Sequence, residues 1–357
     1  MMRTVSHRLS VSLVTLGDPN TLTGGYLFHR RLAELAPRYS AQMAFASVPA
    51  WPFPFPLLCA PRILRVLSGQ RADVVVLDSI AVAFLAPWMA AISVPMVAMA
   101  HQPPGGIDHG PVRRHAQAVL DRAAYRRVRC LLVASQLLAD QFRAQGFADK
   151  LMVVPPGRDV ASAAGEPKRD LRAGAQASLL CVGNWVARKG ILQVLDAVAE
   201  LPAGLARLHL AGDDRSDPRY AARVHRRLAR GDLADRVECH GRLRPQEVAV
   251  LYRDADVFVL PSLREPYGTV YGEAMAAGLP VVGWRAGNLP YLAGHEQEGL
   301  LVEPGNVAGL ASALRSLAED EELRTRLGAA GRRRAAAFPT WEQTAERFFT
   351  AVRAATG

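Results

Sequence analysis

Cysteine is scarce in this chain of 357 residues, and its four cysteines stand far apart without any Cys-x-x-Cys pair. That scarcity disfavours both a disulfide framework and a thiolate metal site. Apolar runs are also short, since none reaches the roughly eighteen residues that a membrane span requires. The run from Leu9 to Leu16 is short for a signal sequence, and no small-residue cleavage site follows it. We therefore expect a cytoplasmic protein with reduced thiols and a first buried strand at Leu9–Leu16.

Motifs of several enzyme classes are missing as well. No G-x-G-x-x-G follows the first predicted strand, which disfavours an NAD-dependent dehydrogenase. His295-Glu296 lacks the second histidine of a zinc protease motif. Asp254-Ala255-Asp256 matches the D-x-D motif of metal-binding sites, but it directly precedes a predicted buried strand. We therefore interpret it as structural. The sequence thus predicts no metal ligands and no bound cofactor.

Positive charge is concentrated in one half of the chain, whose net charge is +10. Residues 1–172 hold 20 Lys and Arg against 11 Asp and Glu, whereas the remaining residues hold 23 against 22. A basic N-terminal domain could face anionic lipid, an anionic acceptor or nucleic acid. Nucleic acid is disfavoured because no recognised binding motif accompanies the charge. A peripheral contact with the inner face of the membrane and a merely solvated helix face both remain open. Much of the excess lies in Arg113, Arg114, Arg122, Arg126, Arg127 and Arg129.

Short apolar runs alternate with amphipathic stretches throughout the sequence. This alternation predicts an α/β protein with parallel sheets, and runs such as 257–260 are apolar at every position, as expected for strands buried on both faces. The predicted strands are 9–16, 43–48, 74–77, 95–99, 130–134, 151–154, 179–182, 206–210, 236–239, 257–260, 280–282 and 300–302.

A stretch rich in Pro, Gly, Ala and charge interrupts this pattern between Pro155 and Ala177. Because it lacks hydrophobic periodicity, we interpret it as a linker between two domains, residues 1–165 and 175–338. After Phe338-Pro339 a further apolar pattern predicts a separate terminal helix within residues 340–357.

The segment from Arg264 to Gly283 carries the most specific chemical signal. It places Glu265 in a loop before a proline and Glu273 inside a helix predicted from near Gly268 to Gly278. The first N–H groups of such a helix have no partner within it and form a ready site for phosphate. The alternative is an ordinary helix with two solvated glutamates. The amides in question belong to Gly268, Thr269 and Val270.

This segment, with two glutamates separated by seven residues and the tail E-A-M-A-A-G-L-P-V-V, resembles the E-x(7)-E motif of retaining family 4 glycosyltransferases. The resemblance implies the GT-B fold, in which two Rossmann-like domains face each other across a cleft and a C-terminal helix crosses back to the first domain. It also implies that Glu273 accepts hydrogen bonds from the donor ribose. Glu265 would contact the donor sugar or order its loop.

A second segment, Gly183 to Gly190, resembles the G-R-x(4)-K-G segment of the same family, where cations neutralise the donor diphosphate. Lys189 matches the lysine, whereas Asn184 stands where an arginine is usual. Arg188 is the neighbouring residue that could supply the missing charge. Each of these cations could instead be a solvated surface group.

Two features of the N-terminal half extend the resemblance. Gly24-Gly25 follows the first strand and resembles the family's glycine-rich turn, where glycine permits positive φ and close approach of the backbone. His101 follows a strand and matches the histidine that faces the donor sugar, although a single histidine is more often structural. The loop Trp51–Pro56 alternates aromatics and prolines, and could line an acceptor site, touch a membrane or pack against its own domain.

The resemblance therefore implies a retaining, metal-independent transfer of a sugar from a nucleotide donor to a glycan, lipid or small-molecule hydroxyl, and we expect the donor to be UDP- or GDP-linked. A nucleotide-sugar hydrolase or epimerase, and a non-catalytic binding protein, are the alternatives, and Asn184 favours the last. The predicted catalytic residues are Glu265, His101 and Lys189; the predicted donor-binding residues are Glu273, Arg188, Asn184, Gly268, Thr269, Val270, Gly24 and Gly25.

Overall fold

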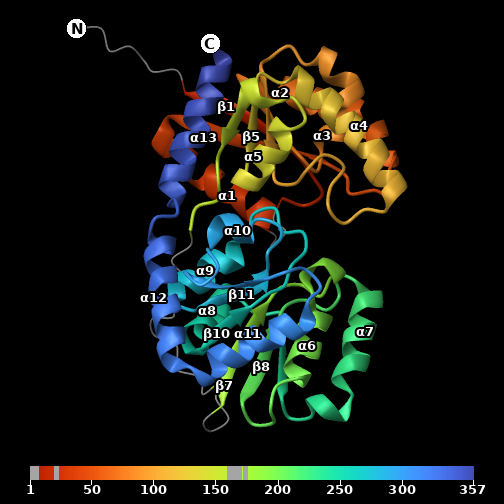
Figure 1. Cartoon of the computed structure of the whole chain (residues 1–357). Coiled ribbons are helices and arrows are strands. Elements are labelled where there is room, and N and C mark those ends of the chain that lie inside the picture. The colour runs from red at the N-terminus through yellow and green to blue at the C-terminus, as the bar shows by residue number, and fades with distance from the viewer. Residues whose placement is uncertain (1–7, 20–23, 159–170, 172–175) are drawn as a thin grey trace, which may run out of the picture. The chain divides into compact units, whose positions relative to one another are not determined.

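The computed structural model describes residues 8–19, 24–158, 171 and 176–357. The chain divides into two compact units (Figure 1). Unit 1 comprises Met1–Gly157 with Pro339–Gly357, and unit 2 comprises Arg158–Phe338. Most of the predicted linker lies outside the described residues.

Unit 1 is built, within the described residues, on a parallel sheet of six strands in the order β2-β1-β3-β4-β5-β6. Every residue of β3 is buried, so both faces of the sheet are covered. The strands are β1 (Leu9–Leu16), β2 (Ala41–Val48), β3 (Val74–Asp78), β4 (Met96–Ala100), β5 (Cys130–Val133) and β6 (Leu151–Val153). The helices are α1 (Gly24–Leu35), α2 (Ala60–Gln70), α3 (Val82–Leu85), α4 (Pro111–Arg127), α5 (Gln136–Arg143) and α13 (Trp341–Thr356).

The terminal helix α13 belongs to unit 1, as the resemblance to GT-B enzymes implies. Thr340 begins it with a capping box, in which Thr340 and Gln343 exchange side-chain and backbone hydrogen bonds. Its apolar face then enters the core of unit 1 through Phe348, Phe349 and Val352, which are almost fully buried.

Unit 2 has a second parallel sheet of six strands, in the order β12-β11-β10-β7-β8-β9 among its described residues. Its strands are β7 (Ala177–Val182), β8 (Ala206–Ala211), β9 (Val237–Gly241), β10 (Val257–Val259), β11 (Val281–Trp284) and β12 (Gly299–Val302). Its helices are α6 (Ile191–Ala199), α7 (Pro218–Leu228), α8 (Pro245–Asp254), α9 (Thr269–Ala277), α10 (Leu289–Leu292), α11 (Val307–Glu319) and α12 (Glu321–Ala336).

Both sheets confirm the predicted strands, and each end agrees to within two residues. In each sheet the chain first adds one or more strands on one side of its first strand, and it then adds the remaining strands on the other side of that strand. The direction of winding therefore reverses between β1 and β3 in unit 1, and between β7 and β10 in unit 2. In open α/β sheets, ligands bind at the carboxyl ends of the strands beside such a reversal. None of the helices formed by the described residues combines the length and apolarity needed to cross a membrane.

Candidate functional site

The loops that follow β7 and β10 meet beside the reversal in unit 2. The carbonyl oxygen of Arg188 accepts hydrogen bonds from the Leu263 N–H at 2.8 Å and from the Ser262 hydroxyl at 3.1 Å. Gly190 has φ 73°, and a Cβ added there would lie 2.5 Å from the carbonyl oxygen of Pro261. Only glycine therefore allows the two loops to lie this close.

This contact between the loops gathers three predicted site residues into one charged cluster. Lys189 Nζ donates to Glu265 Oε2, and Arg188 lies 3.5 Å from the same oxygen. The side chains of Lys189 and Glu265 are only 11% and 12% exposed, so each charge needs its partner. Arg188 also donates to the Arg264 carbonyl oxygen at 3.2 Å. Two cations thus share one carboxylate, which favours a bound anion beside them.

Helix α9 begins next to this cluster at Gly268, whose φ is 88°. A Cβ at Gly268 would lie 2.7 Å from the Tyr271 ring and 3.1 Å from Glu265 Cγ. The N–H groups of Thr269 and Val270 stand in the first turn of α9, where helices lack internal partners for their amides. The start of α9 and Lys189 therefore both approach the side chain of Glu265.

Glu273 lies on α9, one turn after that N-terminus, and is half-buried. The hydroxyl of Tyr252, which comes from α8, donates to Glu273 Oε2 at 3.0 Å. Burial, and then the charge of Glu273, raise the pKa of Tyr252 well above its usual value, so the phenol remains a donor. This bond orients the carboxylate, whose oxygens have lone pairs that can also accept from a ligand hydroxyl.

Asn288 fixes the loop that carries Glu265. Its backbone N–H donates to the Glu265 carbonyl oxygen at 2.9 Å, and its side-chain amide donates to the Tyr267 carbonyl oxygen at 2.8 Å. Gly287 precedes it with φ 59°, and a Cβ there would lie 2.8 Å from the Glu265 nitrogen. The loop is therefore held on both sides by backbone contacts.

Asn184 has a different setting from the Lys189 cluster. It is exposed, and its side-chain oxygen accepts from the Asp213 N–H at 3.4 Å. The Trp185 N–H in turn donates to the Asp213 carbonyl oxygen at 2.9 Å. Asn184 thus joins the loops after β7 and β8, and it brings no charge to the site.

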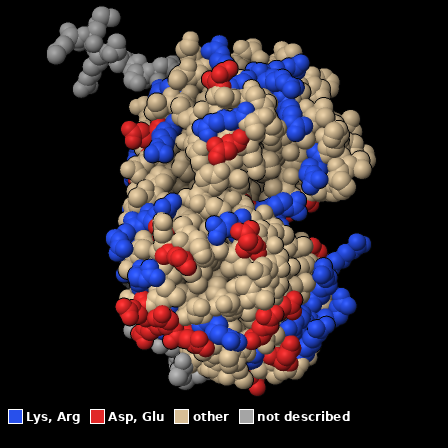
Figure 2. All heavy atoms as spheres, viewed as in Figure 1, with Lys and Arg blue, Asp and Glu red and all other residues tan. Residues whose placement is uncertain are grey.

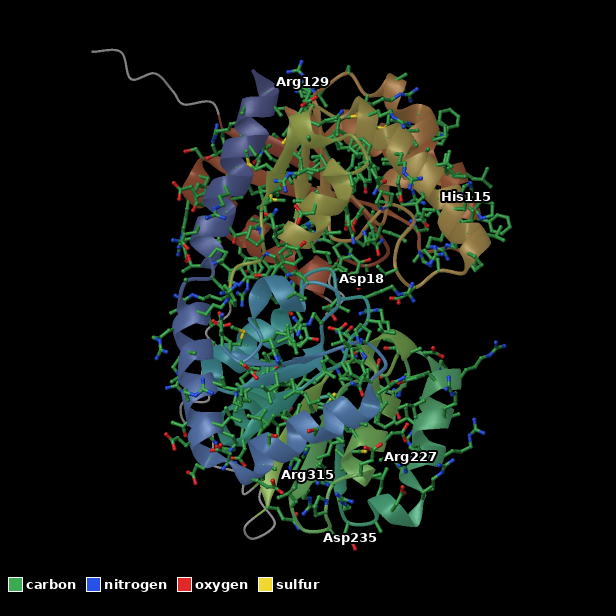
Figure 3. The ribbon with its side chains drawn as sticks, in the orientation of Figure 1. Asp18, His115, Arg129, Arg227, Asp235 and Arg315 are labelled. Carbon is green, nitrogen blue, oxygen red and sulfur yellow. The ribbon has the colours of Figure 1, made fainter. Side chains whose placement is uncertain are left out.

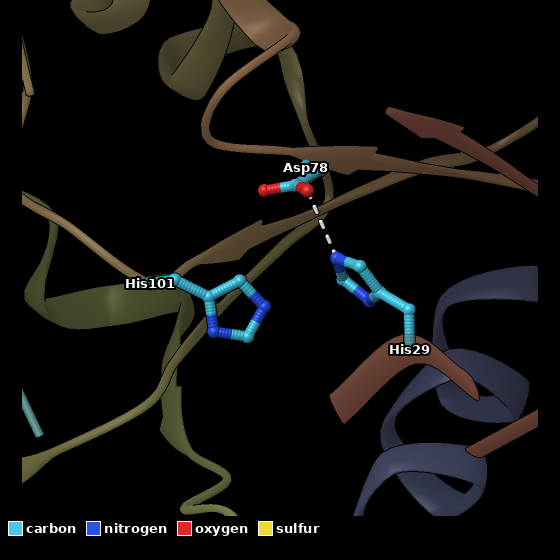
Figure 4. A group of neighbouring side chains, drawn as sticks. All are labelled: His29, Asp78 and His101. Carbon is cyan, nitrogen blue, oxygen red and sulfur yellow. Dashed lines mark hydrogen bonds and ion pairs between the residues drawn. The ribbon is translucent and has the colours of Figure 1, made fainter. Parts of the chain in front are cut away.

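His101 lies in unit 1 at the end of β4, next to a buried pair formed by His29 and Asp78 (Figure 4). His29 Nε2 donates to Asp78 Oδ2 at 2.9 Å, and the Thr15 hydroxyl donates to the same oxygen at 3.0 Å. The rings of His29 and His101 meet edge to face with centroids 5.0 Å apart. These side chains come from β1, β3, α1 and the end of β4, beside the reversal of unit 1.

The two ionisable neighbours in this cluster have shifted pKa values. Burial raises the pKa of Asp78, but the charge of His29 and its hydrogen bond outweigh burial and lower that pKa to about 2. Burial, and next the charge of His29, lower the pKa of His101 to about 4. His101 is therefore a neutral imidazole at pH 7, and its buried Nε2 has no hydrogen-bond partner among the described residues. That nitrogen can donate to or accept from a ligand.

Gly24 and Gly25 form the start of α1 and not the glycine-rich turn before it that the sequence predicts. A Cβ at Gly25 would lie 3.8 Å from the His101 ring, whereas nothing lies within 4 Å of Gly24. Gly25 therefore approaches His101 as part of a helix. The preceding residues 20–23 lie outside the description.

Sequence reasoning did not single out His29, Asp78, Tyr252 or Asn288. Asp78 had a usable signal, because a charged residue closes the otherwise apolar strand β3. His29 and Tyr252 lie within amphipathic helices, and no local pattern distinguishes them from other residues of those helices. Asp254-Ala255-Asp256 is structural, as expected, because Asp256 accepts from the Ser178 N–H at 2.8 Å.

Family models match both parts of the chain. The model for a glycosyl transferase 4-like domain matches residues 3–157, and the model for glycosyl transferases group 1 matches residues 166–334. Together these two models cover most of the chain, which therefore belongs to the glycosyltransferases that they describe.

Similar proteins agree with that membership. A D-inositol 3-phosphate glycosyltransferase of Corynebacterium efficiens is 34% identical over 193 residues, which cover 50% of this chain and 45% of that protein. A lipopolysaccharide core biosynthesis glycosyltransferase, LpsE of Rhizobium meliloti, is 29% identical over 212 residues, which cover 58% and 59%. The chain thus spans about half the length of the first of these curated relatives.

Solved GT-B structures resemble nearly the whole chain. A sucrose-phosphate synthase from Thermosynechococcus elongatus aligns with a TM-score of 0.83 at 22% identity, over 97% of this chain and 99% of that one. Anabaena Alr3699/HepE, solved with UDP and glucose, aligns with a TM-score of 0.79 at 20% identity, over 96% and 99%. At this identity the likeness shows the fold alone.

Proposed function

We propose that this chain transfers a sugar from a nucleoside diphosphate donor to an acceptor hydroxyl, with retention of the anomeric configuration and without a divalent metal. The observation that carries the proposal is the cluster of Lys189, Arg188 and Glu265 beside the N-terminus of α9. Fixed positive charge and a helix N-terminus together suit a diphosphate. The likeness of both parts of the chain to glycosyltransferase models supports the sugar as the group transferred.

The roles of the donor-site residues follow from their surroundings. Lys189, Arg188 and the amides of Thr269 and Val270 stabilise the charge that develops on the leaving diphosphate. Each such preorganised donor contributes on the order of 3 kcal/mol to transition-state stabilisation. These groups do the work that a metal ion does in other transferases. Glu273, oriented by Tyr252, accepts from the ribose hydroxyls.

Glu265 serves this site chiefly by holding the two cations and its own loop in place. Its carboxylate is taken up by Lys189 and Arg188, and its carbonyl oxygen accepts from Asn288. A carboxylate so engaged is a poor covalent nucleophile. We therefore favour transfer on one face of the sugar. The bond from the anomeric carbon to the diphosphate oxygen breaks, the bond to the acceptor oxygen forms, and the leaving diphosphate takes the acceptor's proton.

His101 takes the part of a neutral hydrogen-bonding group toward the sugar. Its low pKa keeps it uncharged at pH 7, and its Nε2 has no hydrogen-bond partner among the described side and main chains. A neutral imidazole matches a neutral hydroxyl better than it matches a phosphate.

The decisive experiment is a thermal-shift titration with UDP, GDP, ADP and TDP sugars, with and without EDTA. A ligand that binds the folded state raises its melting temperature according to concentration over Kd. We expect one nucleotide to give the largest shift, and we expect that difference to persist in EDTA. Glu273→Ala should lose most of the shift, whereas Glu319→Ala, an exposed glutamate at the end of α11, should keep it.

The identified donor is then incubated with and without candidate acceptors. Turnover that needs an acceptor supports transfer, and product that retains the donor's anomeric configuration supports the retaining mechanism. Acceptor-free turnover would point instead to a hydrolase or epimerase. A shift without turnover would point to a binding protein, and no shift with any nucleotide sugar would overturn the proposal.

The acceptor side has a surface of its own in unit 1. Large apolar side chains are exposed there at Trp51, Phe55, Leu58, Trp88 and Val112. Together with the exposed arginines beside them, they form what we call the apolar–arginine surface. They lie on elements that pack in series, from the loop before α2 through α3 to α4. The exposed arginines beside them are Arg62, Arg65, Arg114, Arg126 and Arg127.

Acidic side chains are nearly absent from the apolar–arginine surface. Four acidic residues lie between Trp51 and Arg127, and among them only Asp108 is exposed. Figure 2 shows Asp and Glu sparse over unit 1 and more frequent over unit 2. We propose that this surface contacts an anionic membrane, because aromatic side chains suit the interface and arginines attract anionic lipid.

A further inference from the structure

Two histidines and a glutamate gather on the outer strands of unit 2, and none of them is among the residues assigned to the donor. His209 lies on β8, and Glu238 and His240 lie on the edge strand β9. His209 Nδ1 lies 3.1 Å from His240 Nε2. The Glu238 carboxylate lies 3.8 Å from a ring nitrogen of each histidine. Each residue offers a ligand atom within 4.8 Å of the other two.

A β-bulge creates this grouping. Leu210 pairs with Cys239 and Ala211 pairs with Gly241, so His240 is an extra residue in β9 with no counterpart in β8. Bulges of this kind re-aim a side chain. Here the imidazole of His240 comes to lie against that of His209, with ring centroids 5.3 Å apart.

The surroundings orient the groups as metal ligands are oriented in proteins. His209 Nε2 donates to the Leu171 carbonyl oxygen at 2.8 Å, so Nδ1 is the unprotonated nitrogen. It accepts from His240 Nε2 at 3.1 Å, and a metal ion between the two rings would replace that bond. A metal-bound histidine usually makes such a bond through its other nitrogen. Glu238 Oε2 is held at 3.1 Å by Arg207, as a ligating carboxylate is often held by a neighbour.

The distances suit a small dication. Zinc bonds of about 2.1 Å in a tetrahedral arrangement separate the ligand atoms by about 3.4 Å. The observed separations of 3.1 Å and 3.8 Å approach this value without movement of the backbone. The side chains of His209 and His240 are 1% and 7% exposed, whereas that of Glu238 is 45% exposed. Water can therefore reach a fourth position.

We propose that His209, Glu238 and His240 bind one zinc ion that fastens the edge strand β9 to β8. The ligand set of two imidazoles and one carboxylate is one that zinc accepts. This site is separate from the residues assigned to the donor, so the proposal stands or falls independently of sugar transfer.

Zinc binding by the full-length, untagged protein tests the proposal. The protein is stripped with EDTA, freed of chelator, and titrated with Zn²⁺ in competition with a colorimetric chelator. We expect one equivalent to bind, and we expect His240→Gln to weaken its affinity by about tenfold or more, by analogy with the losses seen when metal-site residues are changed. Glu238→Gln, at an exposed carboxylate, should weaken it also and should leave the fold intact.

Two control variants separate this site from other histidines. His115→Gln changes an exposed histidine on α4 (Figure 3), and His101→Asn changes the histidine cluster of unit 1. Both should keep wild-type zinc affinity. Zn²⁺ should also raise the melting temperature of the wild type but not that of His240→Gln. Absence of stoichiometric binding, equal affinity in the wild type and His240→Gln, or loss in His101→Asn alone would overturn the proposal.

Discussion

The two units place different chemistry at equivalent points of similar sheets. Beside the reversal of winding, unit 1 gathers His29, Asp78 and His101, and unit 2 gathers Lys189, Arg188 and Glu265. In unit 1 a single carboxylate receives hydrogen bonds from an imidazole and a hydroxyl. In unit 2 a single carboxylate is shared by two permanent cations.

The difference teaches what each cluster can recognise. A site with surplus fixed cations holds its charge at every accessible pH, and suits a diphosphate. In unit 1, burial lowers the pKa of His101 to about 4, so this imidazole is neutral at pH 7 and suits hydroxyl groups. Similar strand architecture thus specifies where a ligand can bind, and the loop side chains specify which ligand.

The largest expected effect comes from removing a fixed cation. Lys189→Met should lower donor-dependent turnover by about 10²- to 10³-fold, because one preorganised charge at the leaving group is lost. Steady-state kinetics with the donor identified by thermal shift measure this effect. Arg188→Met should cost less, since Arg188 lies farther from Glu265 and also bonds the Arg264 backbone.

A double variant separates turnover from folding at the same place. Lys189→Met leaves Glu265 nearly buried beside fewer charges, whereas Lys189→Met with Glu265→Gln removes both partners. Urea unfolding should show that the double variant regains stability, while its turnover stays low. Recovery of turnover would show that the pair has only a structural role.

Glycine should matter at the loop contact of unit 2 and not at the start of α1 in unit 1. Gly190→Ala forces a left-handed backbone and a clash with Pro261, and it should lower the free energy of unfolding by about 1–3 kcal/mol. Gly24→Ala has open space and an α-helical setting, so its stability should stay equal or rise. Equal losses in both variants would contradict this contrast.

Acid should weaken unit 1 through His101. Its folded pKa of about 4 lies below the ordinary 6.5, so between these values the unfolded chain binds more protons. His101 alone should therefore remove on the order of 3 kcal/mol of stability as pH is lowered from about 6.5 to 4. Asp121, whose pKa burial raises to about 7, acts in the opposite direction over this range. The contribution of His101 is therefore measured as the difference between the wild type and His101→Asn in urea unfolding across this range. The range stops above the pKa of Asp78, which is about 2.

The smallest expected effect concerns the surfaces of the two units. Arg62→Ser should weaken binding to vesicles containing anionic lipid by about fivefold, because each basic residue near such a membrane contributes about 1 kcal/mol. Arg223→Ser, on α7 of unit 2, should leave binding unchanged. Co-sedimentation with neutral and anionic vesicles measures both, and a response to neutral vesicles alone would exclude the role of charge.

The sequence predicted the sheets well because their signal is local. Runs such as Val257–Val259 are apolar throughout and are bounded by polar loops, so strands can be recognised without their neighbours. The loop from Glu265 to Gly268 was also recognisable, since its residue pattern is local. The pairing of Lys189 with Glu265 was not, because 76 positions separate them and only the adjacency of β7 and β10 brings them together.

Residues on helices were the hardest to assign. His29 reaches Asp78 across 49 positions from a face of α1 that reads as ordinary amphipathic helix. The bulge at His240 likewise depends on the register between β8 and β9, which a single strand does not reveal. Both cases depend on tertiary neighbours that no local pattern encodes.

The return of the chain into unit 1 through α13 makes that unit discontinuous in sequence. Unit 2 is an insertion between Gly157 and Pro339, and its two ends connect to one core. During synthesis the six strands of unit 1 emerge first, yet Phe348, Phe349 and Val352 join their core only after unit 2 has been made. The apolar side chains of unit 1 that α13 covers therefore stay exposed until the end of synthesis, whereas the inserted unit can fold as soon as it leaves the ribosome.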